Sequence, residues 1–152
     1  TDLKIYNLKI LELLVDTYVN SFHISIDEAK IISFEKLNLL ESYISQGNAM
    51  VIVAIGEIEL VGFIWLYMHK FFGEKRVHVN YIAVDKTCRG KGIGKNLIQE
   101  AEKKALNAGI KTIDLIVSEL NLEALNLYDK SGFITERRYM KKKLEVHEDC
   151  FL

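Results

Sequence analysis

The feature of the sequence that most restricts the fold is a glycine-rich turn between an apolar run and a helical pattern. The apolar run covers residues 81–84, and glycines follow at positions 90, 92 and 94. Small and apolar residues then recur at helical spacing over 93–108, and Gly109 stands where a helix C-cap belongs. Glycines let the backbone approach a ligand closely, and the first turn of a helix offers unpaired N–H groups that suit phosphate. The segment therefore predicts a strand, an anion-binding turn and a helix.

Two common phosphate-binding motifs do not fit the spacing of this turn. A P-loop requires glycine five positions before the Gly-Lys pair and Ser or Thr after it, but Arg89 and Asn96 occupy those positions. A dinucleotide-binding fingerprint requires a third glycine where Lys95 or Leu97 stands. The turn alone leaves open a solvated loop that has a glycine cap and ordinary surface lysines.

Hydrophobic periodicity places the other elements along the chain. Residues 11–22 carry apolar side chains at three- and four-residue spacing, and a second helix is expected from Ser25 or Asp27 to Gly47. Runs of β-branched and aromatic residues predict strands over 49–55, 60–69 and 76–84, the first two joined by a hairpin turn. After the glycine-rich turn we expect a helix over 93–108, a strand over 111–117, a helix over 121–130 and paired strands over 133–136 and 139–144.

These elements predict an α+β domain with a mixed sheet, in which two N-terminal helices and an antiparallel meander precede strand–helix–strand–helix–strand. The chain is expected to form one domain over residues 1–152, and 49% hydrophobic with 27% charged residues excludes a disordered chain. The longest apolar run, 60–68, is about half as long as a membrane-spanning helix. Residues 1–9 alternate polar and apolar side chains, unlike a secretory leader.

Charge and cysteine content restrict the partners and the compartment. A net charge of −1 argues against a dedicated nucleic-acid binder, which is usually strongly basic. Two cysteines are too few for a disulfide framework, which favours a reducing, cytoplasmic location. We expect no membrane or nucleic-acid partner.

Two motifs carry a resemblance to a known family. Arg-x-x-Gly-x-Gly, present as Arg89, Gly92 and Gly94, resembles the acetyl-CoA pyrophosphate loop of the GNAT superfamily of N-acetyltransferases. The segment 121–133 is similar to that family's second signature, Asn-x-x-Ala-x-x-x-Tyr-x-x-x-Gly-Phe. The motifs occur in the expected order on the expected elements, and the resemblance covers nearly the whole chain. Lys86 and Cys88 depart from the proline and the aromatic residue that are frequent in the family, at positions that supply no chemistry.

The resemblance implies a donor site for acetyl-CoA along one strand and the loop after it. Backbone groups of Ile82 and Val84 would hold the pantetheine arm, and loop N–H groups would bind the pyrophosphate. The Ile82 N–H would also stabilise the oxyanion of the thioester, a contribution of about 2.7–4 kcal/mol for a preorganised donor. The expected cofactor-binding residues are Ile82, Ala83, Val84, Arg89, Gly90, Lys91, Gly92, Ile93, Gly94, Lys95, Asn121, Ala124 and Tyr128.

By the same resemblance, Tyr128 donates a proton to the departing CoA thiolate and Asn121 contacts the cofactor. Asn121 and Tyr128 share one face of the predicted helix. A phenol has a reference pKa of about 10, so it is protonated at neutral pH and can act as an acid. The alternatives are a half-buried core tyrosine at Tyr128 and a helix N-cap at Asn121.

His78 is the candidate base, because some family members place a glutamate or a histidine at its position. The reference pKa of histidine, near 6.5, suits the role. Strict strand alternation puts Asn80 and Ile82 on the same face as His78, where Asn80 could position a water beside it. The expected catalytic residues are thus Tyr128, His78 and Asn80, and a water chain or an ordinary hydrogen-bonded strand histidine are the alternatives.

No metal site is predicted, because His23, His69 and His147 show no metal-ligand spacing with cysteines or carboxylates. The basic residues of 137–143 follow the expected terminal strand. They indicate either a solvated edge that avoids aggregation or a contact with the CoA 3′-phosphate.

The sequence therefore predicts an N-acetyltransferase that moves the acetyl group of acetyl-CoA to a primary amine by direct attack in a ternary complex. The alternative is a non-catalytic acyl-CoA-binding module, and a nucleotide-binding regulatory domain would require ATP or NAD to compete with CoA. The acceptor stays open among a polyamine, an antibiotic, an amino acid and a protein amine. Asp27, Glu28 and Glu35 would attract a cationic amine or form a solvated helix face, and a homodimer through an exposed strand is compatible with the sequence.

Overall fold

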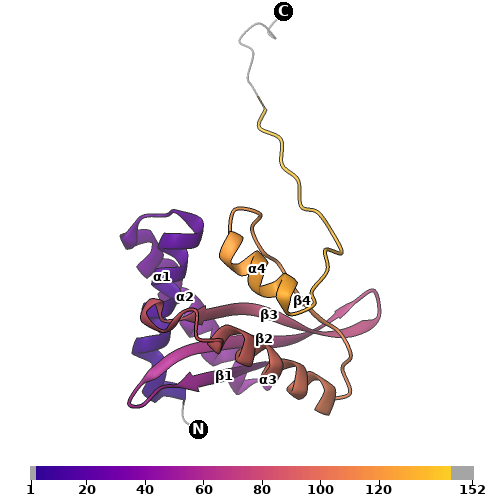
Figure 1. Cartoon of the computed structure of the whole chain (residues 1–152), viewed down its shortest axis with the longest axis horizontal. Helices are drawn as coiled ribbons and strands as arrows, with labels where there is room; N and C mark the ends of the chain where they lie inside the picture. The colour runs from indigo at the N-terminus through magenta and orange to yellow at the C-terminus, as the bar shows by residue number, and fades with distance from the viewer. Residues whose placement is uncertain (1–2, 145–152) are drawn as a thin grey trace, which may run out of the picture.

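The computed structural model describes residues 3–144 and builds them around a four-stranded sheet (Figure 1). Its strands are β1 (Ala49–Ile55), β2 (Leu60–Phe71), β3 (Glu74–Val84) and β4 (Ile113–Leu115), and they lie side by side in that order. The pairs β1–β2 and β2–β3 are antiparallel, and β3–β4 is parallel. The predicted α+β class with a mixed sheet is confirmed.

The α-helices lie close to where the sequence places them, although α1 begins a turn earlier than predicted. They are α1 (Asn7–Phe22), α2 (Ile26–Ser45), α3 (Ile93–Asn107) and α4 (Leu122–Lys130). Two short 3-10 helices, η1 (Leu3–Tyr6) and η2 (Lys86–Cys88), were not predicted. The start of α2 is a capping box, in which the Ser25 side chain accepts from the Glu28 N–H and the Glu28 side chain accepts from the Ser25 N–H. None of the helices within residues 3–144 is both long and apolar enough to cross a membrane.

The sheet separates two hydrophobic cores. On one face, Ile64 and Leu66 of β2 pack with residues of α3 and with Tyr128 of α4. On the other face, Phe63 and Trp65 of β2 pack against α1 and α2. Successive β2 side chains thus alternate between the cores, as a strand that is buried on both faces requires.

A β-bulge at Asn80 interrupts the pairing of β2 with β3. Trp65 pairs with Tyr81 and Leu66 pairs with Val79, so Asn80 is an extra residue on β3. The bulge reverses the alternation of β3 side chains at this point.

As a result, the predicted alternation of His78, Asn80 and Ile82 on one face is wrong. Val77 and Val79 pack in the α3/α4 core, so His78 between them faces α1 and α2. Beyond the bulge, Ile82 packs against the α3/α4 core, on the face opposite to His78.

The expected terminal strands over 133–136 and 139–144 are not formed. Residues 133–144 have no strand structure, and Figure 1 shows them leaving the body of the protein as an extended segment. A strand needs a neighbour to accept and donate its backbone hydrogen bonds. This segment instead contacts the body through side chains: Arg76 binds Glu136 at 2.7 Å, and the Arg137 guanidinium lies over the Phe71 ring.

Candidate active site

The end of β3 has an edge that pairs with no other strand of residues 3–144. β4 pairs with β3 at residues 77–79, so residues 80–84 extend beyond the paired part. The Asp85 N–H donates to the Val61 oxygen on the β2 side at 2.8 Å, and hydrogen-bonding direction alternates along a strand. The backbone N–H and C=O groups of Ile82 and Val84 are therefore directed away from β2, toward the open edge.

The loop after β3 adopts a backbone conformation that favours glycine. Gly90 and Gly92 have φ angles of 75° and 80°, and a Cβ at either position would meet no atom within 4 Å. Gly92 is the N-cap of α3, so the unpaired N–H groups of the first helical turn lie beside an open surface. Lys91 and Lys95 are exposed next to it, and the chemistry of these groups together suits an anion.

Gly94 is needed for packing rather than for its dihedral angles. A Cβ on Gly94 would lie 3.2 Å from the Leu127 Cδ2 atom of α4. The glycine therefore lets the start of α3 approach α4 closely. This contact places the two signature segments of the chain side by side.

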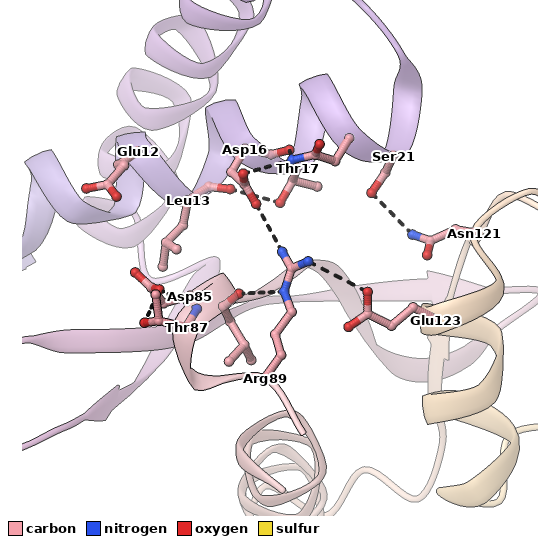
Figure 2. Close-up of polar contacts among 12 residues, drawn as sticks. Glu12, Leu13, Asp16, Thr17, Ser21, Asp85, Thr87, Arg89, Asn121 and Glu123 are labelled. Carbon is pink, nitrogen blue, oxygen red and sulfur yellow. Dashed lines mark hydrogen bonds and ion pairs between the residues drawn. The ribbon is translucent and has the colours of Figure 1, made fainter. Parts of the chain in front are cut away.

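Arg89 connects the loop to two helices (Figure 2). Its Nε donates to the Val84 carbonyl oxygen at 3.1 Å, and one Nη donates to the Asp16 carboxylate of α1 at 3.0 Å. The other Nη lies 3.7 Å from the Glu123 carboxylate of α4. The guanidinium that the sequence assigns to the cofactor thus binds protein groups in this structure, one of them a carbonyl on the open edge.

Asp85 holds the start of the loop against α1. Its carboxylate accepts from the Thr87 N–H at 2.9 Å and from the Thr87 hydroxyl at 2.7 Å, and it lies 2.7 Å from the Lys9 ammonium. The Lys9 contact first, and then the Thr87 hydrogen bonds, hold the pKa of the Asp85 carboxyl far below its usual range. The pair is partly buried, with side-chain exposures of 18% for Lys9 and 14% for Asp85, so solvent screens it less than a surface pair.

Replacing Asp85 with asparagine is expected to lower the free energy of unfolding by about 1–3 kcal/mol at pH 7, because it removes the charge that binds Lys9. The folded-state pKa is depressed, so the contribution of Asp85 is complete above about pH 4 and is lost as the pH falls. Urea unfolding at pH 7 and pH 3 measures the difference between wild type and variant, which should shrink at pH 3.

The control for this prediction is Glu12→Gln, since Glu12 is the exposed second partner of Lys9 and is expected to contribute less than about 1 kcal/mol. Equal destabilisation by both variants, or a difference that does not depend on pH, would contradict the assigned role of Asp85.

Tyr128 lies in the α3/α4 core, with 9% of its surface exposed. Its ring contacts the Phe133 ring at a centroid distance of 5.5 Å, and burial raises the pKa of Tyr128 to about 12. Asn121 is the N-cap of α4, where its side chain accepts from the Ala124 N–H at 3.1 Å. The side-chain nitrogen of Asn121 also lies 3.4 Å from the Ser21 hydroxyl of α1, so the start of α4 is held near α1 (Figure 2).

His78 belongs to a polar cluster on the α1/α2 face of the sheet. Its Nδ1 lies 2.7 Å from the Asp114 carboxylate of β4, and the same carboxylate lies 3.0 Å from the Nε2 of His69. The Arg76 guanidinium is 3.5 Å from Asp114, and the Tyr67 ring is 4.9 Å from the His78 ring. The side chains of this cluster thus come from three neighbouring strands.

Comparison with known proteins identifies the family to which this chain belongs. Residues 8–133 match the family described as the acetyltransferase (GNAT) family. The chain belongs to the GNAT acetyltransferase family. Among solved structures, a provisionally named acetyl transferase from Pyrococcus furiosus is 31% identical with a TM-score of 0.76, over 95% of this chain and 97% of that chain. An aminoglycoside acetyltransferase from a soil metagenome shares the fold at 18% identity, with a TM-score of 0.69 over 96% of this chain and 91% of that chain.

Two curated relatives match over shorter segments. YwnH of Bacillus subtilis, provisionally named a phosphinothricin acetyltransferase, is 37% identical over 73 residues, which are 45% of this chain and 44% of YwnH. The mycothiol acetyltransferase of Propionibacterium freudenreichii is 31% identical over 93 residues, which are 59% of this chain and 30% of that protein. The matched segments span less than half of these two relatives.

In this GNAT chain, Tyr128 and His78 lie on opposite faces of the sheet, and His78 is close to the point where the pairing of β3 with β4 ends. Val79 packs in the same core as Tyr128, and His78 is the residue before it on the other face. The open edge of β3 begins directly after this pair.

The sequence analysis missed Asp114 and the position of His69 beside it. Spacing along the chain does not reveal a cluster whose members come from three strands. Two signals were present: a single aspartate lies between apolar residues of a short strand, and the turn at Phe72 and Gly73 sets a hairpin register that brings His69 near His78.

Proposed function

We propose that this GNAT protein is a cytoplasmic N-acetyltransferase that transfers the acetyl group of acetyl-CoA to a primary amine by direct attack in a ternary complex. The observation that carries the proposal is the open backbone edge of Ile82 and Val84, which leads into the Gly92 cap of α3. The edge suits the amides of a pantetheine arm, and the cap with Lys91 and Lys95 suits a pyrophosphate. The two features are adjacent, as a single ligand that carries both groups requires.

Different backbone groups of the chain would bind different parts of acetyl-CoA. The Ile82 N–H would donate to the thioester carbonyl, and the N–H groups of the loop would donate to the pyrophosphate. The Val84 carbonyl accepts from Arg89, so a pantetheine amide would have to share or replace that contact. The proposed binding set is completed by Gly90, Ala83, Ile93, Gly94, Asn121 and Ala124.

The proposed reaction forms a C–N bond and breaks a C–S bond. The amine attacks the thioester carbon, and His78, or a water held by Asn80, takes the proton that the amine loses. The Tyr128 hydroxyl donates a hydrogen bond to the sulfur as negative charge develops on it. Because His78 and Tyr128 lie on opposite faces, the acceptor would approach from the α1/α2 face and the thiolate would leave toward the α3/α4 face.

The acceptor is proposed only as a primary amine. Of the three acidic residues that the sequence suggests for its attraction, Glu28 serves in the capping box of α2. Glu35 lines a groove of 710 Å³ between α1 and α2, and Asp27 is in the first turn of α2.

Calorimetric titration with acetyl-CoA, CoA and ATP tests the donor site. We expect acetyl-CoA and CoA to bind with Kd values on the order of 1–100 μM, about −5 to −8 kcal/mol, and ATP not to bind. Thiol release with a panel of amines then tests turnover. Absence of CoA binding would overturn the proposal, and binding without turnover on any amine would favour an acyl-CoA-binding module.

A further inference from the structure

Two imidazoles at hydrogen-bond distance and one guanidinium at ion-pair distance surround the carboxylate of Asp114. His78 Nδ1 is 2.7 Å from Oδ1, His69 Nε2 is 3.0 Å from Oδ2, and an Arg76 Nη is 3.5 Å from Oδ2. The His78, His69 and Asp114 side chains are 14%, 25% and 21% exposed, so the contacts lie mostly out of solvent. Hydrogen bonds to a charged group are strong in such surroundings.

The geometry determines which imidazole nitrogens carry protons. Burial raises the pKa of Asp114, but the hydrogen bonds from His78 and His69 outweigh it and lower the pKa below its usual value. Burial, and then the charge of Asp114, raise the pKa of the neighbouring Tyr67. An ionised carboxylate only accepts hydrogen bonds, so His78 carries its proton on Nδ1, and a neutral His78 has its lone pair on Nε2.

The same three residues could in principle bind a metal ion, since their ligand atoms lie within 4.8 Å of one another. Two features of the cluster disfavour this. One nitrogen of each imidazole is at hydrogen-bond distance from the carboxylate, so the carboxylate already has partners within the protein. The Arg76 cation is also next to Asp114, and it would repel a second positive charge.

We propose that Asp114 is a positioning residue, which holds His78 in the tautomer that leaves Nε2 free to accept a proton, and that His69 orients the Asp114 carboxylate. The inference rests on the proposed function, because the role of His78 as base belongs to it. Asp114 balances the positive charge that His78 gains when it takes the amine proton. His69 Nε2 lies 3.0 Å from Oδ2 and 3.1 Å from Oδ1, and it thereby holds the carboxylate with Oδ1 2.7 Å from His78 Nδ1.

The test combines nitrogen NMR of the histidine side chains with steady-state kinetics. In the wild type we expect the His78 resonances of an Nδ1–H tautomer. Asp114→Asn should shift them toward the other tautomer and lower kcat by about 100-fold or more, with the KM for acetyl-CoA changed by less than about threefold. Asp114→Glu should restore part of kcat, and His69→Gln should give a smaller loss. Glu100→Gln, which removes an exposed carboxylate from α3, is the matched control and should leave both readouts unchanged.

The outcomes separate this inference from the proposed function. A wild type that releases no thiol with any amine refutes the function, whereas an active wild type whose Asp114→Asn variant keeps its kcat refutes the positioning role. An unchanged His78 tautomer in Asp114→Asn also refutes it, with or without turnover. Titration with zinc chloride should show no micromolar binding, and one tightly bound equivalent that is lost in Asp114→Asn would reassign the cluster as a metal site.

Discussion

Replacing Tyr128 with phenylalanine is expected to lower kcat by about 100- to 1,000-fold, with the Kd of acetyl-CoA changed by less than about twofold. Burial raises the pKa of Tyr128 to about 12, so the hydroxyl is protonated at neutral pH but is a weaker acid than a free phenol. A thiol has a reference pKa of about 8.5, so complete proton transfer from Tyr128 to the thiolate would be unfavourable. We therefore expect Tyr128 to act mainly as a hydrogen-bond donor to the developing charge, a contribution of about 2.7–4 kcal/mol.

The measurement is kcat between pH 7 and pH 10, together with calorimetry of acetyl-CoA binding. Because the pKa of Tyr128 is raised, its proton is retained as the pH rises, and wild-type kcat should show no loss from Tyr128 ionisation below about pH 11. Phe133→Leu is the control, since it changes the ring that packs on Tyr128 and keeps the hydroxyl. Equal losses of kcat and of binding in Tyr128→Phe would mean that the residue acts through packing.

The conformation of the glycine-rich loop, on the proposed donor side of the site, could be predicted from the sequence because its features are local. A positive φ at Gly90 and Gly92 is a property of a single residue, and the helix that starts after Gly92 follows from spacing over the next turns. Asn121 shows the limit of such an inference. Its place at the start of a helix predicts the observed N-cap, but its contact with Ser21 joins residues that are distant in the sequence.

The arrangement of the proposed acceptor side could not be predicted, because it depends on how the strands pair. The bulge at Asn80 reverses which face of the sheet the following β3 side chains point to. The alternation of side chains within one strand does not reveal that an extra residue is present. The prediction of terminal strands over 133–136 and 139–144 was wrong for a related reason, since periodicity does not supply a neighbouring strand to pair with. Asp114 comes near His78 only through the parallel pairing of β4 with β3.

Replacing His78 with glutamine is expected to lower kcat/KM for the amine by about 100- to 10,000-fold at pH 7, the usual contribution of a positioned base. An alkylamine has a reference pKa near 10.4, so its reactive neutral form is scarce at pH 7 and abundant near pH 10. The deficit of the variant should therefore narrow as the pH rises, because an amine that binds in its neutral form does not need a base to remove an ammonium proton before it attacks. Thiol release at pH 7 and pH 9.5 measures both values.

His23→Asn is the control for the loss of an imidazole, because His23 caps α1 with a φ of 55°, a conformation that asparagine tolerates. The His23→Asn variant should leave kcat/KM unchanged.

Asn80→Ala separates the two candidate routes for the proton. If His78 is the base, His78→Gln should lose more activity than Asn80→Ala, whereas a water held at the bulge predicts the reverse. A His78→Gln variant within about twofold of wild type would assign the proton to water and would remove the reason for an Asp114–His78 pair in the reaction.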